Sequence, residues 1–143
     1  MNFFFDNNLN LLLLLLMLGS GAALLIPGLL RSGEQVSTLQ ATQLINQGKT
    51  LLLDVRDAAS FATGHLREAR NIPLKDLPAR IAELNKLKGK TVIVVCTSGL
   101  QSSRATGMLR SAGFEKVMSL TGGLNAWQAQ GLPVIRQPAT AAA

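Results

Sequence analysis

The sequence predicts an α/β protein: a doubly wound sheet of mostly parallel strands with helices on both faces, preceded by one transmembrane helix. Short apolar runs alternate with amphipathic segments from about residue 34 onward, and this order is typical of parallel strands joined by crossover helices. The beginning of the chain differs, since residues 11–30 contain no charged residue. The remainder of the 143-residue chain is long enough for one domain with a buried core.

Residues 11–30 are long enough to cross a membrane, because about 20 helical residues span roughly 30 Å. A secretory signal peptide is the alternative interpretation. However, the residues before the apolar run include Asp6 and no lysine or arginine, and the run continues through residues 22–26 instead of stopping at a cleavable site. We therefore predict a retained anchor over residues 1–32 that contacts membrane lipid through residues 11–30.

The distribution of charge predicts the orientation of this anchor. All fourteen lysine and arginine residues lie from Arg31 onward, so the positive-inside rule places the following domain in the cytoplasm and the N-terminus outside. From Arg31 onward, fourteen basic and seven acidic residues give a formal charge of +7. No interleaving of aromatic and basic residues indicates a nucleic-acid face, so we expect no nucleic-acid partner. A protein partner in the membrane is compatible with the sequence, which does not identify one.

The domain is predicted over residues 33–136, followed by a disordered, low-complexity tail at residues 137–143. Its helices are expected where apolar residues recur every three or four positions and a glycine follows, and its strands where a short apolar run stands alone. In chain order we predict a lead-in at residues 34–36, a helix from Ser37 or Thr38 to Gly48, a strand at 50–55, a helical turn at 58–63, a strand at 69–72, a helix at 76–86, a strand at 91–95, a helix at 102–112, a strand at 116–120 and a helix at 123–130.

Cys96 directly follows the clearest strand, residues 91–95, which is β-branched throughout (TVIVV). One cysteine and one histidine can form neither an internal disulfide nor a structural zinc site, so no metal is expected. Ligands of open parallel sheets bind beyond the carboxyl ends of the strands. If the connection over residues 96–101 curls back, its backbone N–H groups would stabilise an exposed thiolate or persulfide. From spacing alone, a buried structural cysteine is an equally open interpretation.

Four segments resemble the motifs of single-domain rhodaneses. Residues 96–102 (CTSGLQS) resemble the active-site loop Cys-x-x-Gly-x-x-Ser, and residues 53–56 (LDVR) resemble the Leu-Asp-Val-Arg motif. Residues 61–73 (FATGHLREARNIP) are similar to the Gly-His segment, and residues 120–134 (LTGGLNAWQAQGLPV) to the closing Gly-Gly segment. The motifs occur in the family's order and cover nearly all of residues 36–134.

This resemblance implies a rhodanese-like fold and a sulfurtransferase that needs no cofactor. Cys96 would take the outer sulfur of thiosulfate or of a protein persulfide, and a thiol or cyanide would then remove it. Asp54 and Arg56 would form an ion pair that braces the active-site loop. The persulfide would be held by the backbone amides of Thr97, Ser98, Gly99, Leu100, Gln101 and Ser102.

The loop departs from the family pattern in its charge. Many relatives that use thiosulfate carry a basic residue inside the loop, whereas Thr97, Leu100 and Gln101 are neutral. Arg104 is the nearest arginine, and its direction is open. We therefore expect a protein persulfide to be a better donor than thiosulfate. Glu68 also replaces a glycine that is usual in the Gly-His segment, and nothing in the sequence explains this change.

Other residues are expected to serve the fold. His65 is interpreted as a hydrogen-bonding residue rather than a general base, and Trp127 as core packing. Gly122 and Gly123 are interpreted as a turn before the last helix, with a close approach of their backbone to the site as the lesser alternative.

Two other functions compete with sulfur transfer. Cysteine phosphatases use Cys-x₅-Arg, and the required arginine position is occupied by Ser102, so phosphatase activity is not expected. A membrane-anchored adaptor with weak or no catalysis is the alternative that remains.

Overall fold

The computed structural model describes residues 11, 13, 15 and 33–137. The chain divides into two compact units, Met1–Ser32 and Gly33–Ala143. The predicted transmembrane helix lies outside the described residues, except that Leu11, Leu13 and Leu15 are helical. Within the described ranges, no helix has the length and hydrophobicity that a membrane crossing requires. The predicted tail after Gln137 also lies outside them.

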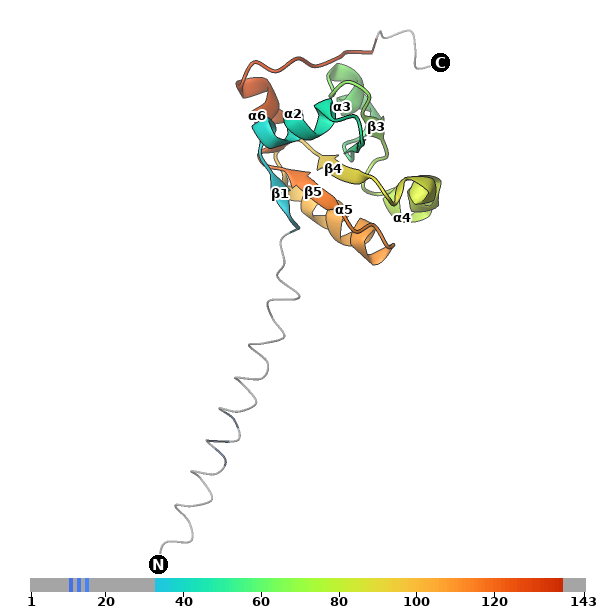
Figure 1. The fold of residues 1–143 in the computed structure, drawn as a ribbon, viewed down its shortest axis with the longest axis vertical. Coiled ribbons are helices and arrows are strands. Elements are labelled where there is room, and N and C mark those ends of the chain that lie inside the picture. The colour runs from blue at the N-terminus through green and yellow to red at the C-terminus, as the bar shows by residue number, and fades with distance from the viewer. Residues whose placement is uncertain (1–10, 12, 14, 16–32, 138–143) are drawn as a thin grey trace, which may run out of the picture. The chain divides into compact units, whose positions relative to one another are not determined.

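A five-stranded parallel sheet forms the centre of the second unit (Figure 1). The strand order is β1-β5-β4-β2-β3, and every neighbouring pair is parallel. β4 is the middle strand, with β5 on one side and β2 on the other. The strands are β1 (Gln35–Val36), β2 (Thr50–Asp54), β3 (Arg70–Asn71), β4 (Thr91–Val95) and β5 (Val117–Leu120).

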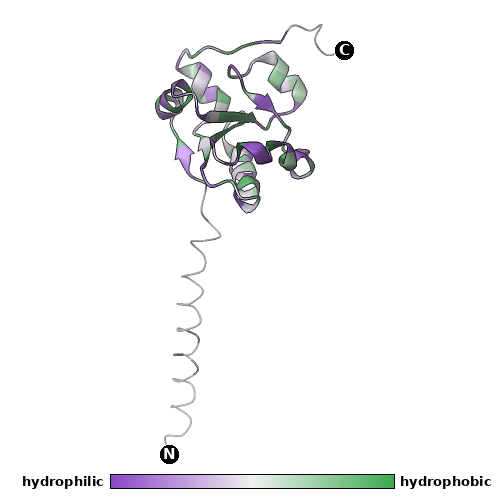
Figure 2. Ribbon diagram, turned by 45° about the vertical axis from the view of Figure 1, so that its right-hand side comes forward, coloured by the Kyte–Doolittle hydropathy of each residue, from purple (hydrophilic) through white to green (hydrophobic). Residues whose placement is uncertain are grey.

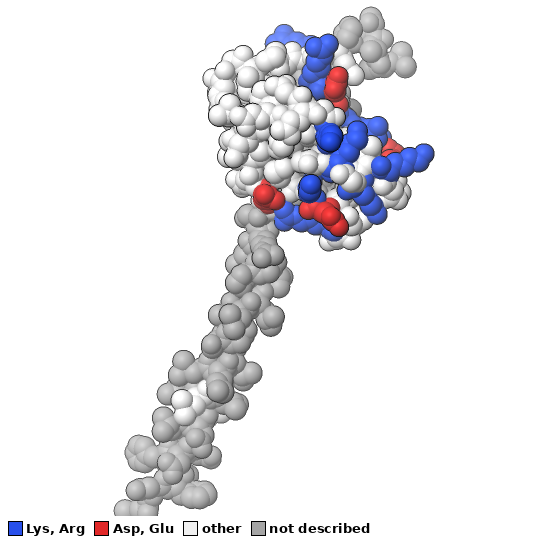
Figure 3. All heavy atoms as spheres, viewed as in Figure 1, with Lys and Arg blue, Asp and Glu red and all other residues white. Residues whose placement is uncertain are grey.

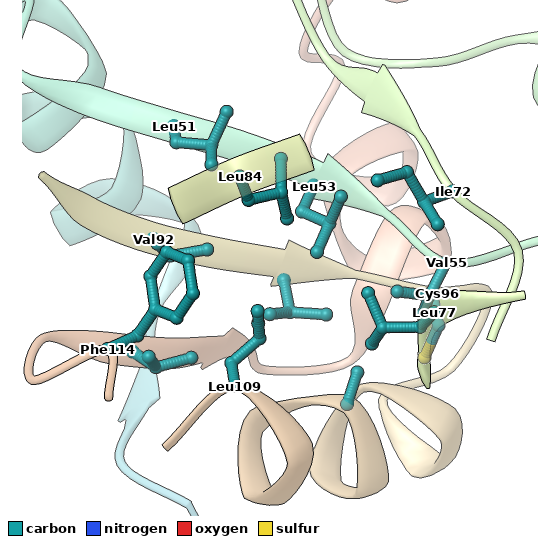
Figure 4. Close-up of a cluster of buried hydrophobic side chains, with 13 residues drawn as sticks. Leu51, Leu53, Val55, Ile72, Leu77, Leu84, Val92, Cys96, Leu109 and Phe114 are labelled. Atoms are coloured by element: carbon teal, nitrogen blue, oxygen red, sulfur yellow. The ribbon is translucent and has the colours of Figure 1, made fainter. Parts of the chain in front are cut away.

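Side chains of β4 alternate between two hydrophobic clusters, one on each face of the sheet. Val92, Val94 and Cys96 belong to one cluster (Figure 4), and Ile93 and Val95 belong to the other. A strand that is buried on both faces must be apolar at every position, which accounts for its TVIVV sequence. Figure 2 shows the resulting concentration of hydrophobic residues in the middle of the domain.

Helices cover both faces, as the doubly wound prediction requires. The cluster of Figure 4 takes its helical residues from α4 (Leu77–Arg80), from the 3-10 helix η1 (Ile81–Leu87) and from α5 (Leu100–Ser111). The opposite cluster takes them from α2 (Thr38–Asn46) and α6 (Gly123–Ala129). α3 (Ala58–Thr63) follows the carboxyl end of β2.

Two predicted elements were wrong in kind. Residues 35–36 are an edge strand and not a lead-in, because they pair with Ser119 and Leu120 of β5. The helix predicted over residues 76–86 is one turn of α-helix followed by η1. Its apolar residues Ile81, Leu84 and Leu87 are spaced by three, which suits the 3-10 repeat of three residues per turn.

The N-terminal ends of α2 and α5 test the predicted helix starts. Ser37 is the N-cap of α2, and its side chain forms a capping box with Gln40, so this predicted cap is confirmed. α5 begins at Leu100, two residues before the predicted start at Ser102. Gly99 is its N-cap in a left-handed conformation (φ 100°) and supplies no side chain, so residues 100–102 belong to the helix rather than to the loop.

Charged side chains are unevenly distributed over the face shown in Figure 3. Lysine and arginine gather over the side that holds α4, whereas the side of α2 and α6 is almost free of charge. On the face shown, the basic residues therefore lie at the surface on the side of α4, where water solvates them.

Candidate active site

Cys96 lies directly after β4, at the carboxyl edge of the sheet. Its residue exposure is 1%, and it packs in the same cluster as Val55 and Leu77 (Figure 4). The expectation of an exposed sulfur was therefore wrong, because the turn at residues 97–99 and the start of α5 enclose it. Burial alone does not distinguish a structural cysteine from a reactive one. The groups that contact the sulfur provide that distinction.

The backbone N–H of Gly99 donates a hydrogen bond to Cys96 Sγ, with a distance of 2.9 Å between nitrogen and sulfur. Gly99 is the N-cap of the twelve-residue α5, so the sulfur lies at the positive end of a helix dipole. In the part of the chain that the structure describes, Gly99 supplies the one backbone amide of residues 97–102 that donates to Sγ. The predicted ring of six amides is thus reduced to one direct donor and the unpaired amides of the first helical turn.

The start of α6 holds the carbonyl groups of the same turn. Leu124 N–H donates to Cys96 O at 2.8 Å, and Asn125 N–H donates to Thr97 O at 3.1 Å. Gly123 has a φ of 59°, and a Cβ there would approach Thr97 O to 2.7 Å. The predicted turn before the last helix is present at residues 121–122, and Gly123 also makes the close approach to the site that was the lesser alternative. The carbonyl oxygens of Cys96 and Thr97 thus bond to α6 and not to the N–H of Gly99. That N–H donates to the sulfur instead.

Asp54 and Arg56 form a buried ion pair, as predicted. Arg56 Nη2 lies 2.7 Å from Asp54 Oδ2, and Arg56 Nε lies 3.0 Å from Asp54 Oδ1, which makes the contact bidentate. Arg56 also donates to Gly64 O at 2.7 Å and to Ser60 O at 3.3 Å. The pair therefore ties the end of β2 to α3 and to Gly64, and in the described part of the chain no side-chain hydrogen bond joins the pair to residues 96–102.

A cleft of about 700 Å³ lies beyond the ends of β2 and β4. The strand order reverses at this point, since β3 lies on one side of β2 and β4 on the other, and such switch points are where open α/β sheets bind ligands. Thr97 and Gln101 line the cleft, and Arg104 faces it as well, which resolves the direction of that side chain. Cys96 itself does not line the cleft, so the sulfur lies behind its wall.

Two cations and one anion set the charge of the cleft, apart from the neutral Asp54–Arg56 pair. Lys75 and Arg104 supply the positive charges, and Asp57 supplies the negative one. Hydrogen bonds from Ser60 lower the pKa of Asp57, whose carboxylate caps α3 and remains ionised at neutral pH. The cleft therefore carries a small net positive charge.

The remaining residues of the predicted loop differ in exposure. Thr97 and Ser98 are exposed, and Leu100 is 81% exposed even though it is apolar. Ser102 is fully buried.

A second buried hydroxyl was not predicted from the sequence. Ser119 of β5 is 2% exposed, and its Oγ contacts Ser102 Oγ in a hydrogen bond. The sequence offered one weak signal, a polar residue inside the apolar run of residues 116–120.

His65 and Trp127 serve the fold, as predicted. His65 Nδ1 lies 2.8 Å from Phe61 O, its ring stacks on Phe61, and its backbone pairs with Ile135. Trp127 is 6% exposed, and its Nε1–H donates to Pro133 O at 3.0 Å.

Comparison with known proteins agrees with the motifs and the fold. Residues 37–130 match the family model of the Rhodanese-like domain. A protein named Sulfurtransferase from Allochromatium vinosum is 33% identical over 93 residues, which are 65% of this chain and 85% of that protein. The uncharacterized protein slr1261 of Synechocystis sp. is 39% identical over 99 residues, which are 69% of this chain and 53% of that protein. The chain therefore spans about half the length of this relative.

Solved structures show the same likeness. The solution structure of the Rhodanese-like domain from the Anabaena sp. Alr3790 protein has a TM-score of 0.65 at 34% sequence identity, and the match covers 73% of this chain and 80% of that one. Residues 37–130, which the family model matches, include β4, Cys96 and α5. From its motifs, its parallel sheet and these relatives, the chain belongs to the rhodanese-like family.

Proposed function

We propose that this chain is a rhodanese-type sulfurtransferase that carries a sulfane sulfur as a persulfide on Cys96. The observation that supports this proposal most directly is the hydrogen bond from Gly99 N–H to Sγ at the N-terminus of α5. A donor and a helix dipole aimed at one sulfur stabilise a thiolate or a persulfide anion. A cysteine that only fills core space needs neither.

The reaction divides into two displacements. The Cys96 thiolate attacks the outer sulfur of the donor, so that a new S–S bond forms while the donor's own bond to that sulfur breaks. The electron pair leaves with sulfite when the donor is thiosulfate, or with a thiolate when it is a persulfide. An acceptor thiolate or cyanide then attacks the outer sulfur, and Cys96 leaves as a thiolate. Because the sulfur is enclosed at rest, residues between it and the cleft must move during transfer.

A protein persulfide is the donor that we favour, with thiosulfate as the weaker one. The side chains of Thr97, Leu100 and Gln101 are neutral, and an 81% exposed Leu100 beside the site suits contact with another protein surface. Arg104 and Lys75 give the cleft some affinity for an anion, so we expect thiosulfate to act as the weaker donor.

Mass spectrometry of the purified chain tests the proposal. We expect incubation with a cysteine desulfurase and cysteine, or with thiosulfate, to add the mass of one sulfur atom to the wild type and none to Cys96→Ala. No gain from any donor would overturn the proposal. The family's fold would then serve as an adaptor, an alternative that the 1% exposure of Cys96 favours.

Two single substitutions distinguish the donors. Leu100→Asp should slow sulfur uptake from the protein donor and leave uptake from thiosulfate unchanged. Arg104→Gln should raise the KM for thiosulfate by up to about fivefold, because it removes one exposed ion pair with the anion. Uptake from the protein donor should stay unchanged. Equal effects of both variants on both donors would contradict the assignment.

We further propose that residues 11–30 anchor the chain in a membrane with the N-terminus outside and the domain in the cytoplasm. The absence of charge from this segment and the confinement of lysine and arginine to residues from Arg31 onward support this proposal. An Asn8→Cys variant in a Cys96→Ala background has one thiol, at the N-terminal flank. We expect an impermeant maleimide to label it in intact cells. Labelling only after lysis would overturn the orientation.

A further inference from the structure

A pair of buried hydroxyl groups lies beside the Cys96 sulfur. Ser102, in the first turn of α5, is fully buried, and its Oγ lies 3.6 Å from Cys96 Sγ. Ser119 of β5 contacts Ser102 through its own hydroxyl and is 2% exposed. An apolar residue is the usual occupant of such a strand position, because a buried hydroxyl must keep a hydrogen-bond partner. Packing of the core therefore does not explain why two hydroxyl groups are buried here.

Ser102 has one hydroxyl hydrogen and three neighbouring acceptors. These are Gly99 O at 2.9 Å, Cys96 Sγ at 3.6 Å and Ser119 Oγ. While Cys96 is a thiol, its S–H donates to Ser102 Oγ, and Ser102 donates to Gly99 O. Once the sulfur has lost its proton to water, it can only accept, and the Ser102 hydrogen can turn to it.

Two further serines make this rearrangement possible without an unpaired group. Ser103 Oγ lies 3.4 Å from Gly99 O and donates to it, so this carbonyl keeps a partner when Ser102 turns away. Within the described part of the chain, Ser102 is the one side-chain partner of Ser119, and because Ser102 donates its hydrogen to Gly99 O, Ser119 is the donor between the two hydroxyls. A hydroxyl that accepts a hydrogen bond becomes a stronger donor itself.

We propose that Ser119 is a positioning residue for sulfur transfer: it holds and polarises the Ser102 hydroxyl, which then donates to the anionic Cys96 sulfur. This inference rests on the proposed persulfide chemistry. The charged groups of the neighbouring cleft are the Asp54–Arg56 pair at the end of β2 together with Asp57, Lys75 and Arg104. None of them contacts Ser119 through a hydrogen bond in the described residues, so a substitution there leaves them in place.

The rate at which iodoacetamide alkylates Cys96 tests the inference, and it does so without any sulfur donor. Cys96 is the one cysteine of the chain, so alkylation of the full-length protein in detergent reports this thiol alone. We expect Ser119→Ala to lower the rate at neutral pH by about three- to tenfold, the loss of roughly one hydrogen bond, and to displace the pH profile upward. The plateau at high pH reports access to the sulfur and should stay unchanged.

Three variants separate positioning from packing. Ser119→Thr keeps the hydroxyl and should restore the wild-type profile, and Ser111→Ala, on the exposed end of α5, should match the wild type. Ser102→Ala should slow alkylation at least as much as Ser119→Ala, and adding Ser119→Ala to it should have no further effect. A lower melting temperature of Ser119→Ala with an unchanged pH profile would overturn the inference, as would a further loss in the double variant.

The outcome is separable from that of the proposed function. If the wild type takes up no sulfur but the alkylation profiles differ as expected, the sulfur-transfer proposal fails and the role of Ser119 toward the thiolate stands. If sulfur is taken up and the profiles coincide, the positioning role fails alone.

Discussion

Arg56 illustrates how one side chain can support a site without touching its chemistry. It makes a bidentate contact with the fully buried Asp54 and closes the segment from Ser60 to Gly64 through two carbonyl groups. Removing one partner of such a pair leaves the other charge buried and uncompensated, which costs about 3–5 kcal/mol. We therefore expect Arg56→Ala to lower the free energy of unfolding in urea by that amount.

The chain offers a control for this prediction at its surface. Arg80 and Glu83 form an ion pair whose side chains are 42% and 50% exposed, so solvent already screens the pair. Arg80→Gln should unfold at the same urea concentration as the wild type. If the two arginine variants lose stability equally, burial is not what makes the Asp54–Arg56 pair important.

Residues of the site differ in how far the sequence could predict them. Cys96, Asp54 and Arg56 follow from motifs whose residue types carry the chemistry, and the structure pairs the two charges. Ser119 could not be found in this way, because its partner Ser102 lies 17 residues away and the contact depends on how α5 packs on β5. The burial of Cys96 was missed because it depends on how the turn at residues 97–99 and α5 fold over the end of β4 and on packing against Val55 and Leu77.

At the scale of elements, the start of α6 controls the turn after β4. Gly123→Ala would force a side chain onto a backbone with a φ of 59° and toward the carbonyl oxygens of Cys96 and Thr97. The turn can accommodate it only by giving up the bonds from Leu124 and Asn125. We expect a loss of stability above about 1 kcal/mol and a loss of most sulfur uptake by Cys96, measured by urea unfolding and mass spectrometry.

Gly107→Ala is the matched control and should act in the opposite direction. Gly107 lies within α5, has no atom near its added Cβ and has a helical backbone. Alanine there should raise the free energy of unfolding by about 0.5–1 kcal/mol and leave sulfur uptake unchanged. A stabilised Gly123→Ala, or a destabilised Gly107→Ala, would contradict this account of the two glycines.

Elements with a strong local signal were predictable, and those set by distant contacts were not. β4 and α2 follow from a β-branched run and from a capped amphipathic segment. β1 is two residues long and exists because it pairs with β5, 84 positions later, so no local period could indicate it. The start of α5 was misplaced because its N-cap is Gly99, which supplies no side-chain hydrogen bond, so the sequence carries no side-chain cap signal at the true start.

At the scale of the whole molecule, one sheet connects two separate hydrophobic clusters. Leu109 of α5 belongs to one cluster, and Trp127 of α6, the single tryptophan, belongs to the other. Leu109→Ala should cost about 2–5 kcal/mol, because it removes fully buried apolar atoms. If the domain unfolds as one unit, Trp127 fluorescence and far-UV circular dichroism should shift to the same lower midpoint.

Two separate midpoints for Leu109→Ala would show that the two faces of the sheet unfold independently.

The alternation of strands and helices predicted the doubly wound class, but not which strands are neighbours. The order β1-β5-β4-β2-β3, and with it the cleft at the switch point, depends on pairings between residues far apart in the chain.

The central position of β4 has a consequence for how the site moves. A strand bonded to neighbours on both sides releases its amides only when the whole domain opens, so Ile93 and Val94 should show the slowest hydrogen–deuterium exchange. The opposite wall of the cleft borders on the two-residue β3, the single turn of α4 and η1, which open more readily. We therefore expect Cys96, the proposed nucleophile, to be held by the most rigid strand, while the opposite wall of the cleft adjusts to the sulfur donor.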